Sequence, residues 1–399
     1  MSPNMHWTMK NPSVGTDPIP VERYTSQEYF QQERKKVFQN SWLNIGRAAQ
    51  IPKPGDFFVH DFPLAKTSIL VVRTKGGQIN AFHNMCSHRG NPVMWEKRGN
   101  CRGYFTCRFH GWVYDTSGEL MHVTDEGNFP SVKKSENSLT SIHCDVWQGF
   151  IFVHLGQTPQ QSLADYLAPV TMNVDGYPFD AMEPSFSYRI HENVNWKILS
   201  EAQLEGWHLP FLHPNTLAKA VKVTGGKTFR HASLERLGVH GLCSSPAPDT
   251  YEPSPVGLLS VRYGVGTMDA FASKSTMDLA EKATGPKWRG AFDFWHIFPN
   301  MFLGLLNGTY FTFNVWPVAI DQSMWEIKGY YPPVKNAGQL FAREFSKIGL
   351  RDPMMEDSFA HEKIQSVLAS GAKKSFHLQD EELAVRHFTD MVNQRVIAE

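Results

Sequence analysis

The sequence has few cysteines, no long apolar run and no excess of charge of either sign. Five Cys in 399 residues are too few for a disulfide framework, so we expect a reducing, cytoplasmic environment. No apolar run approaches the ~20 residues of a membrane span, and the first residues, MSPNMHWTMKNPSVGTDPIP, lack the order of a signal peptide. The 39 basic and 39 acidic residues argue against nucleic-acid partners and against an anionic membrane surface.

Internal repeats and complete phosphate-binding loops are also missing. TGGKT at 224–228 lacks the earlier Gly of a P-loop, and GVGTMD at 264–269 lacks the third Gly of a dinucleotide-binding loop. We therefore expect no site for ATP or NAD on this chain.

The periodicity of the chain predicts an α+β protein. A helix is expected over 24–42, with Thr25 and Glu28 as a capping box and with Phe30, Val37 and Phe38 on its apolar side.

The pattern of strands and helices along the rest of the chain predicts two domains. Short strands between Gly, Pro and Asp predict a small antiparallel β domain over 42–157. Residues 158–399 mix strands with helical stretches near 196–209, 353–370 and 379–397, which predicts a larger α+β domain. We expect residues 1–41 to pack on this larger domain.

Two cysteine–histidine pairs stand in a stretch that reads CSHRGNPVMWEKRGNCRGYFTCRFHGW. Cys86 and His88 form the first pair, Cys107 and His110 form the second, and 18 residues separate His88 from Cys107. A Rieske [2Fe–2S] cluster requires two Cys on one iron and two His on the other. Two loops that each carry one Cys and one His meet this requirement, and the Gly after each pair would let backbone N–H groups approach the sulfurs.

Other interpretations of these pairs stay open on spacing alone. Zinc accepts the same thiolate and imidazole ligands, and the four residues could also be ordinary buried side chains. Cys101, Cys144 and Cys243 match neither spacing, and we interpret them as packed free thiols.

A second candidate metal site lies in NWKILSEAQLEGWHLPFLHP at 195–214. Glu205 precedes His208 by three positions and is expected on the same helix face. His213 would lie about 140° away from His208 on an ideal helix, so the helix must end or distort near Pro210 and Pro214 for the imidazoles to converge. Two His and one carboxylate would bind non-heme Fe(II) and leave positions open for O₂. The alternative is two core histidines.

These motifs resemble those of the Rieske non-heme iron ring-hydroxylating oxygenases, specifically their large (alpha) terminal oxygenase subunits. CSHRG, CRFHGWVYDTSGEL and the NWK segment carry the resemblance. It implies a Rieske domain and a catalytic domain of helix-grip type, with an antiparallel sheet flanked by helices. The implied cofactors are one [2Fe–2S] cluster and one Fe²⁺ per chain, with O₂ as co-substrate and NAD(P)H acting only through a reductase.

The resemblance also implies residue roles. His208 and His213 would bind the iron, and Glu205 would bridge it to the Rieske His of a neighbouring subunit. The segment RDPMMEDSFAHEKIQ is similar to the family's acidic segment and implies Asp357 as third ligand, with Asp352, Glu356 and Glu362 as fallbacks. Ala202 and Trp207 stand where the family frequently has Asn and Tyr, so regiochemistry cannot be transferred.

The expected function is hydroxylation of a hydrophobic aromatic or alicyclic ring compound for degradation. The expected partners are a ferredoxin or reductase and two further copies of the chain in a head-to-tail homotrimer, with a small β subunit as an open question. The alternatives are oxidative O- or N-demethylation and, from another class, a Rieske electron carrier without oxygenase activity. A carrier would need only about 110 residues and would leave 195–214 without a role.

Overall fold

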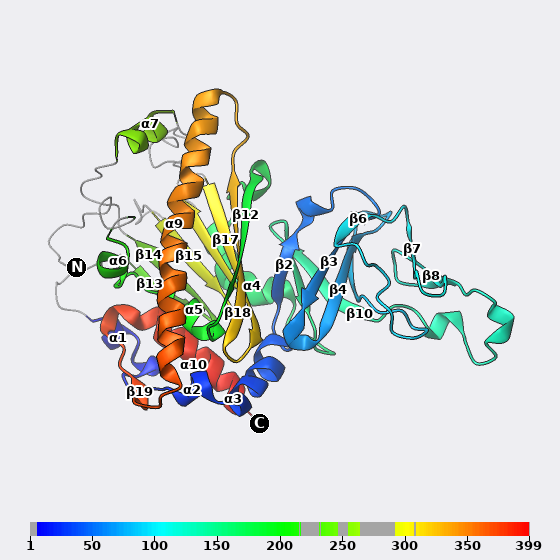
Figure 1. Ribbon diagram of the computed structural model, residues 1–399, viewed down its shortest axis with the longest axis horizontal. Coiled ribbons are helices and arrows are strands. Elements are labelled where there is room, and N and C mark those ends of the chain that lie inside the picture. Colours follow the sequence, from blue (N-terminus) through cyan, green and yellow to red (C-terminus); the bar gives the residue numbers. More distant parts are fainter. Residues whose placement is uncertain are drawn as a thin grey trace. The chain divides into compact units, whose positions relative to one another are not determined.

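The structure, a computed structural model, describes residues 6–214, 216, 231, 233–245, 254–263, 292–306 and 309–398. Its two compact units are Phe38–Tyr166, the smaller unit, and Met1–Val37 with Leu167–Glu399, the larger unit (Figure 1). The TGGKT and GVGTMD segments lie outside the described residues.

The smaller unit is built on antiparallel sheets, as the short strands between Gly, Pro and Asp residues predict. A seven-stranded sheet has the order β2-β11-β10-β5-β4-β3-β6, and a three-stranded sheet has the order β7-β8-β9. Four consecutive apolar residues of the central strand β4, from Ile69 to Val72, are fully buried, so both faces of the sheet are covered there. The strands are β2 Leu43–Arg47, β3 Asp56–Phe62, β4 Thr67–Arg73, β5 Ile79–His83, β6 Arg98–Asn100, β7 Tyr104–Thr106, β8 Val113–Asp115, β9 Leu120–His122, β10 Ser141–Trp147 and β11 Phe150–His154.

The larger unit contains one antiparallel seven-stranded sheet in the order β12-β18-β17-β16-β15-β14-β13. Its central strand β17 is buried along most of its length, which is typical of a strand covered on both faces. The strands are β12 Glu183–Glu192, β13 Ser233–Leu237, β14 His240–Ser245, β15 Phe292–Ile297, β16 Met301–Leu306, β17 Thr309–Ala319 and β18 Gln322–Tyr331, with a separate short pair of β1 Ile19–Pro20 and β19 Ser375–Phe376.

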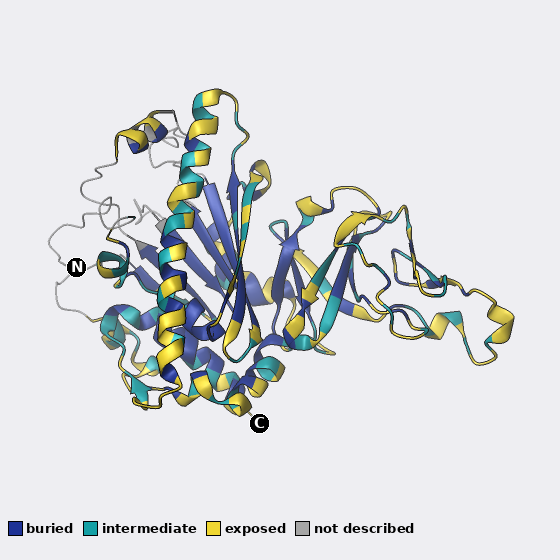
Figure 2. Ribbon diagram, viewed as in Figure 1, coloured by how far each residue is buried: buried dark blue, intermediate teal, exposed yellow. Residues whose placement is uncertain are grey.

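Helices cover one face of this sheet, with their buried sides inward and exposed sides outward (Figures 1 and 2). Phe388 of α10 packs edge-on against His296 of β15, and His361 of α9 packs against Trp325 of β18. The α-helices are α1 Trp7–Lys10, α2 Glu22–Thr25, α3 Gln27–Gln32, α4 Leu163–Val174, α5 Trp196–Ala202, α6 Leu209–Leu212, α7 Pro255–Tyr263, α9 Ala337–Leu368 and α10 Leu383–Ile397. The predicted α+β class is confirmed.

The predicted N-terminal helix is wrong in detail. The N-terminal helix is broken into α2, α3 and a π-helical turn, Glu33–Phe38, and the residue that caps α3 is Ser26 rather than Thr25. The Ser26 side chain accepts the N–H of Tyr29, while the Thr25 hydroxyl instead donates to the carbonyl of Val21. The predicted apolar residues of this segment are nevertheless all buried.

The long C-terminal helix α9 begins sixteen residues earlier than predicted. Asn336 caps it by accepting the N–H of Gln339, and the helix continues through Pro353, which we interpreted as its start. Within the described part of the chain, no helix is both long and apolar enough to span a membrane.

Candidate metal centres

The segment between α5 and α6 brings the two candidate iron-binding histidines together. Asn195 caps α5 by accepting the N–H of Lys197, and α5 ends at Ala202. His208 and His213 then flank the single turn of α6, the first as its N-cap and the second as its C-cap. The imidazole rings meet edge to face with their centroids 5.2 Å apart.

Glu205 does not share a helix face with His208, which corrects the sequence-based expectation. Both residues lie in the non-helical segment between α5 and α6. The Glu205 carboxylate accepts the backbone N–H groups of Trp207 and His208, so its side chain replaces the helical acceptors that these donors would otherwise use. The same carboxylate also accepts from Nδ1 of His208.

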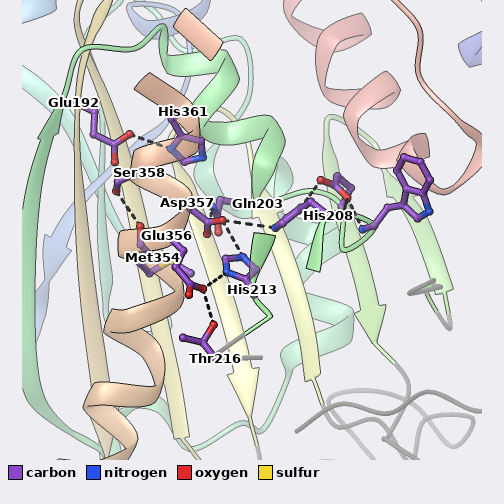
Figure 3. Close-up of polar contacts among 12 residues, drawn as sticks. Glu192, Gln203, His208, His213, Thr216, Met354, Glu356, Asp357, Ser358 and His361 are labelled. Carbon is purple, nitrogen blue, oxygen red and sulfur yellow. Dashed lines mark hydrogen bonds and ion pairs between the residues drawn. The ribbon is translucent and has the colours of Figure 1, made fainter. Parts of the chain in front are cut away.

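Asp357 of α9 completes the group (Figure 3). Its Oδ1 lies 3.0 Å from Nε2 of His213 and 3.6 Å from Nε2 of His208. One ligand atom from each of these three residues falls within 4.8 Å of the others. Gln203 Nε2 donates to the other carboxylate oxygen of Asp357 at 3.4 Å.

The donor set fits a divalent metal ion. The outer nitrogen of each imidazole faces a carboxylate: Glu205 at His208, and Glu356 at His213 with a distance of 2.7 Å. A carboxylate only accepts hydrogen bonds, so each Nδ1 carries the proton and each Nε2 is left with a lone pair. The Oδ1 atom of Asp357 is buried and accepts no hydrogen bond within the described residues. Two imidazoles and one carboxylate with open positions suit Fe(II).

The pKa of the His213 imidazole is raised. Burial by itself lowers it, but the carboxylates of Asp357 and Glu356 outweigh burial because both favour the imidazolium form. Protons therefore compete with a metal ion at this nitrogen as the pH falls.

None of the three fallback carboxylates takes the place of Asp357 beside the two Nε2 atoms. Asp352 pairs with Arg351 at the surface, and Glu362 accepts the N–H of Asn193. Glu356 binds the outer nitrogen of His213 and the hydroxyl of Thr216, so it supports a candidate ligand. Sequence reasoning missed this supporting role of Glu356 and the contact of Gln203, because neither follows from a local motif.

The two Cys–His loops of the smaller unit share one backbone design. Cys86 donates its N–H to the carbonyl of Asn91, and its own carbonyl accepts the N–H of Gly90. Cys107 makes the same two bonds: it donates its N–H to the carbonyl of Trp112, and its own carbonyl accepts the N–H of Gly111. Gly90 and Gly111 have φ of +74° and +73°, a conformation that suits glycine.

The histidines of the two loops lie side by side, and so do their buried cysteines. Both Cys are 2% exposed, and the rings of His88 and His110 lie 4.5 Å apart. Nδ1 of His88 is buried and has no hydrogen-bond partner in the described parts of the chain, so it is available as a ligand atom. Trp112 stacks on the His88 ring and fixes its plane.

Side-chain donors lie at the sulfurs, which the sequence did not reveal. The hydroxyl of Tyr114 lies 3.3 Å from Sγ of Cys86, and Asn91 Nδ2 lies 3.6 Å from Sγ of Cys107. The backbone N–H of His88 also approaches Sγ of Cys86, as expected, whereas the N–H groups of the two glycines donate to the cysteine carbonyls. The remaining thiols, Cys101, Cys144 and Cys243, are free.

Comparison with known protein families matches two separate parts of the chain, one in each compact unit. Residues 179–398 match the model of the ring-hydroxylating alpha subunit, catalytic domain, and residues 41–134 match the Rieske [2Fe–2S] domain. The chain belongs to the ring-hydroxylating oxygenase alpha-subunit family. The predicted resemblance is thereby confirmed, and the Rieske match favours a [2Fe–2S] cluster over zinc at the Cys–His loops.

Curated relatives in this family differ in substrate. The glycine betaine monooxygenase oxygenase subunit of Pseudomonas aeruginosa is 29% identical over 199 residues, which are 50% of this chain and 45% of the relative. The biphenyl 2,3-dioxygenase subunit alpha of Rhodococcus jostii is 37% identical over 132 residues, 33% of this chain and 28% of the relative. The matched stretches thus span less than half of each curated relative.

Solved structures show the same fold over nearly the whole chain. The quaternary ammonium Rieske monooxygenase CntA superposes with a TM-score of 0.77 at 17% identity, covering 98% of this chain and 99% of that one. Naphthalene 1,2-dioxygenase from Rhodococcus sp. superposes with a TM-score of 0.75 at 20% identity, covering 99% and 98%.

Proposed function

We propose that this chain is a terminal oxygenase component that hydroxylates a hydrophobic aromatic or alicyclic ring compound with O₂ and electrons from a ferredoxin or reductase. The observation that carries the proposal is the convergence of His208, His213 and Asp357, whose buried Oδ1 lies 3.0 Å from Nε2 of His213, in a chain that also has two Cys–His loops. A pure electron carrier has no need of the first of these sites.

The residues that hold the cofactors follow from the geometry. We assign the [2Fe–2S] cluster to Cys86, His88, Cys107 and His110, and Fe²⁺ to His208, His213 and Asp357. Such a cluster would store one electron at a time, and such an iron would offer open positions to O₂. Glu205 and Glu356 hold the protons on the outer imidazole nitrogens, so each ring keeps its inner lone pair for the metal.

Aromatic side chains support a hydrophobic substrate. On the helix-covered face of the sheet, the ring of Phe294 packs against Phe302, Phe311 and Phe313, with centroids 5.4 to 5.9 Å apart. The same face contacts the segment between α5 and α6, which carries His208. Cys243 pairs with Phe294 across neighbouring strands, and its Sγ donates to the carbonyl of Leu204. This layer favours a ring compound over a strongly polar one.

A second candidate is oxidative demethylation, including that of a quaternary ammonium compound. The similarity to the glycine betaine monooxygenase oxygenase subunit favours a quaternary ammonium substrate, a class that carries N-methyl groups. The aromatic layer is compatible with it as well, since aromatic faces attract quaternary ammonium groups. Only the products separate the two candidates.

We further propose that electrons pass between copies of the chain in a head-to-tail homotrimer. His88 or His110 of one copy would face Glu205 of the next, which already holds His208. Electron transfer between subunits has been described for CntA. The exposed side chains of Met85, Trp95 and Phe109 around the cluster loops support an interface at this place.

The test begins with composition and ends with products. The oxygenase is expected to contain two acid-labile sulfides and about three irons per chain, whereas a carrier contains two irons. The reduced protein is then given O₂ and a panel of neutral ring compounds, methyl ethers and trimethylammonium compounds. A mass gain of one oxygen, or of two oxygens with two hydrogens, supports hydroxylation, and loss of a methylene unit supports demethylation. Zinc without sulfide would refute the proposal.

A further inference from the structure

A buried carboxylate near the candidate iron site has no role in the metal site as described so far. Glu192 is the last residue of the edge strand β12, where it is 4% exposed and pairs with Ser323 of β18. Both of its oxygens accept hydrogen bonds from α9. Ser358 Oγ donates to Oε1 at 2.5 Å, and His361 Nδ1 donates to Oε2 at 3.0 Å (Figure 3).

The two donors lie beside Asp357 on the same helix. Residues advance by about 100° along an α-helix, so Ser358 lies about 100° and His361 about 40° to one side of Asp357. Glu356 lies about 100° to the other side, where it binds Nδ1 of His213 and the hydroxyl of Thr216. Contacts on both sides therefore determine the direction in which Asp357 points.

The helix needs such support at this point. Pro353 lies one turn before Asp357 and removes one hydrogen bond of the helix, because proline has no N–H. The Ser358 hydroxyl also lies 2.9 Å from the carbonyl of Met354, in the turn that follows the weakened one, so this carbonyl and Glu192 share its single proton. The two bonds to Glu192 instead hold α9 to strand β12 just after this weakened turn.

We propose that Glu192 is a positioning residue for the mononuclear metal site, acting through Ser358 and His361 on the orientation of Asp357. The inference rests on the proposed function, because it assumes that Asp357 is a metal ligand. Glu192 itself touches none of the three candidate ligands in any contact described above, so its effect passes through α9.

The test measures metal binding rather than turnover. The mononuclear site of the full-length protein, with its cluster intact, is emptied by a chelator and titrated with Co(II), whose visible spectrum reports ligand number and geometry. Glu192→Ala is expected to weaken Co(II) binding about tenfold and to shift the spectrum towards that of Asp357→Ala. Glu192→Gln keeps an acceptor for Ser358 and is expected to stay within about threefold of the wild type.

Controls separate positioning from stability. Glu183→Ala changes an exposed glutamate at the other end of β12 and is expected to bind Co(II) as the wild type does. If Glu192→Ala does not fold, Ser358→Ala removes one of the two bonds and is expected to weaken binding severalfold. Wild-type Co(II) affinity and spectrum in these variants, even with a lower melting temperature, would overturn the inference. Wild-type binding by Asp357→Ala would instead refute the proposed iron site.

Discussion

Nζ of Lys197 lies 2.6 Å from Oε1 of Glu33, and both side chains are at most 2% exposed. The second carboxylate oxygen of Glu33 accepts the indole N–H of Trp196 at 3.0 Å. Burial raises the pKa of Glu33 and lowers that of Lys197, and each charge partly offsets the shift of the other. This pair joins the π-helical turn Glu33–Phe38 to α5, and the segment with the candidate ligand His208 follows α5 directly.

Lys197→Met is expected to destabilise the larger unit by about 3 to 5 kcal/mol, because it leaves the Glu33 carboxylate buried without its partner. The double variant Glu33→Leu with Lys197→Met removes both charges and is expected to be more stable than the single variant. Chemical denaturation followed by circular dichroism measures the difference. A single variant as stable as the double would show that the pair contributes little.

Glu201 gives the larger unit a pH-dependent stability. Burial, above all, raises the pKa of Glu201 to about 8, and its Oε1 accepts the hydroxyl of Tyr24 at 2.7 Å. The unfolded chain loses this proton near pH 4.5, whereas the folded chain keeps it to about pH 8. The folded state thus binds more protons in this window, so the stability that Glu201 contributes is fully present below pH 4.5 and is lost as the pH rises to 8.

Glu201→Gln is expected to flatten this fall. One extra bound proton in the folded state gives a slope of about 1.4 kcal/mol per pH unit, and the solvent access that Glu201 keeps shortens the pH range over which this slope applies. Melting temperatures of the variant and the wild type, measured between pH 5 and 8 with the same metal content, report the difference. Parallel curves would mean that Glu201 ionises normally.

The sequence predicted those parts of the site that are local in the chain. Cys86 and His88 are two residues apart, and Cys107 and His110 are three apart, so their convergence within each loop follows from spacing. His208 and His213 converge because one short helical turn fits between them, although the predicted helix through Glu205 does not exist.

Long-range relationships were not predictable from the residues alone. Asp357 reaches His213 only because α9 packs beside α5, and only the family resemblance indicated it. Glu192 carries no sequence signal at all, since its partners Ser358 and His361 lie more than 160 residues away. The start of α9 was misplaced because Pro353 looks like a helix boundary, whereas tertiary packing tolerates it inside.

Glu356 should tune the affinity of the metal site without being a ligand. Its carboxylate holds Nδ1 of His213 at 2.7 Å, so Glu356→Ala removes the acceptor that orients the ring. We expect iron affinity to fall about 10- to 100-fold, while Asp357→Ala abolishes binding and leaves the cluster intact. Iron titration of the chelated protein distinguishes them. Equal losses in both variants would mean that Glu356 binds the metal directly.

Glu205→Ala tests the proposed route between subunits. The variant is expected to bind both cofactors, the iron more weakly because His208 loses its Nδ1 acceptor, and to show no turnover even when loaded with iron, because the carboxylate that would join His208 to the neighbouring cluster is gone. Metal analysis and single-turnover assays after anaerobic reduction measure the two properties separately. Product formation at the wild-type rate would remove Glu205 from the electron route, whereas iron loss alone would make it a positioning residue.

Tyr114 is expected to raise the reduction potential of the cluster. Its hydroxyl lies 3.3 Å from Sγ of Cys86 and accepts the backbone N–H of Ser87 at 3.0 Å, which directs the hydroxyl proton towards the sulfur. Hydrogen bonds to the sulfurs favour the reduced cluster, since they stabilise its additional negative charge. Tyr114→Phe keeps the buried ring and should lower the midpoint potential in a redox titration followed by electron paramagnetic resonance. Tyr104→Phe, at an exposed position of the same unit, is the matched control and should leave the potential unchanged; an equal potential in both variants would show that the Tyr114 hydroxyl does not act on the cluster.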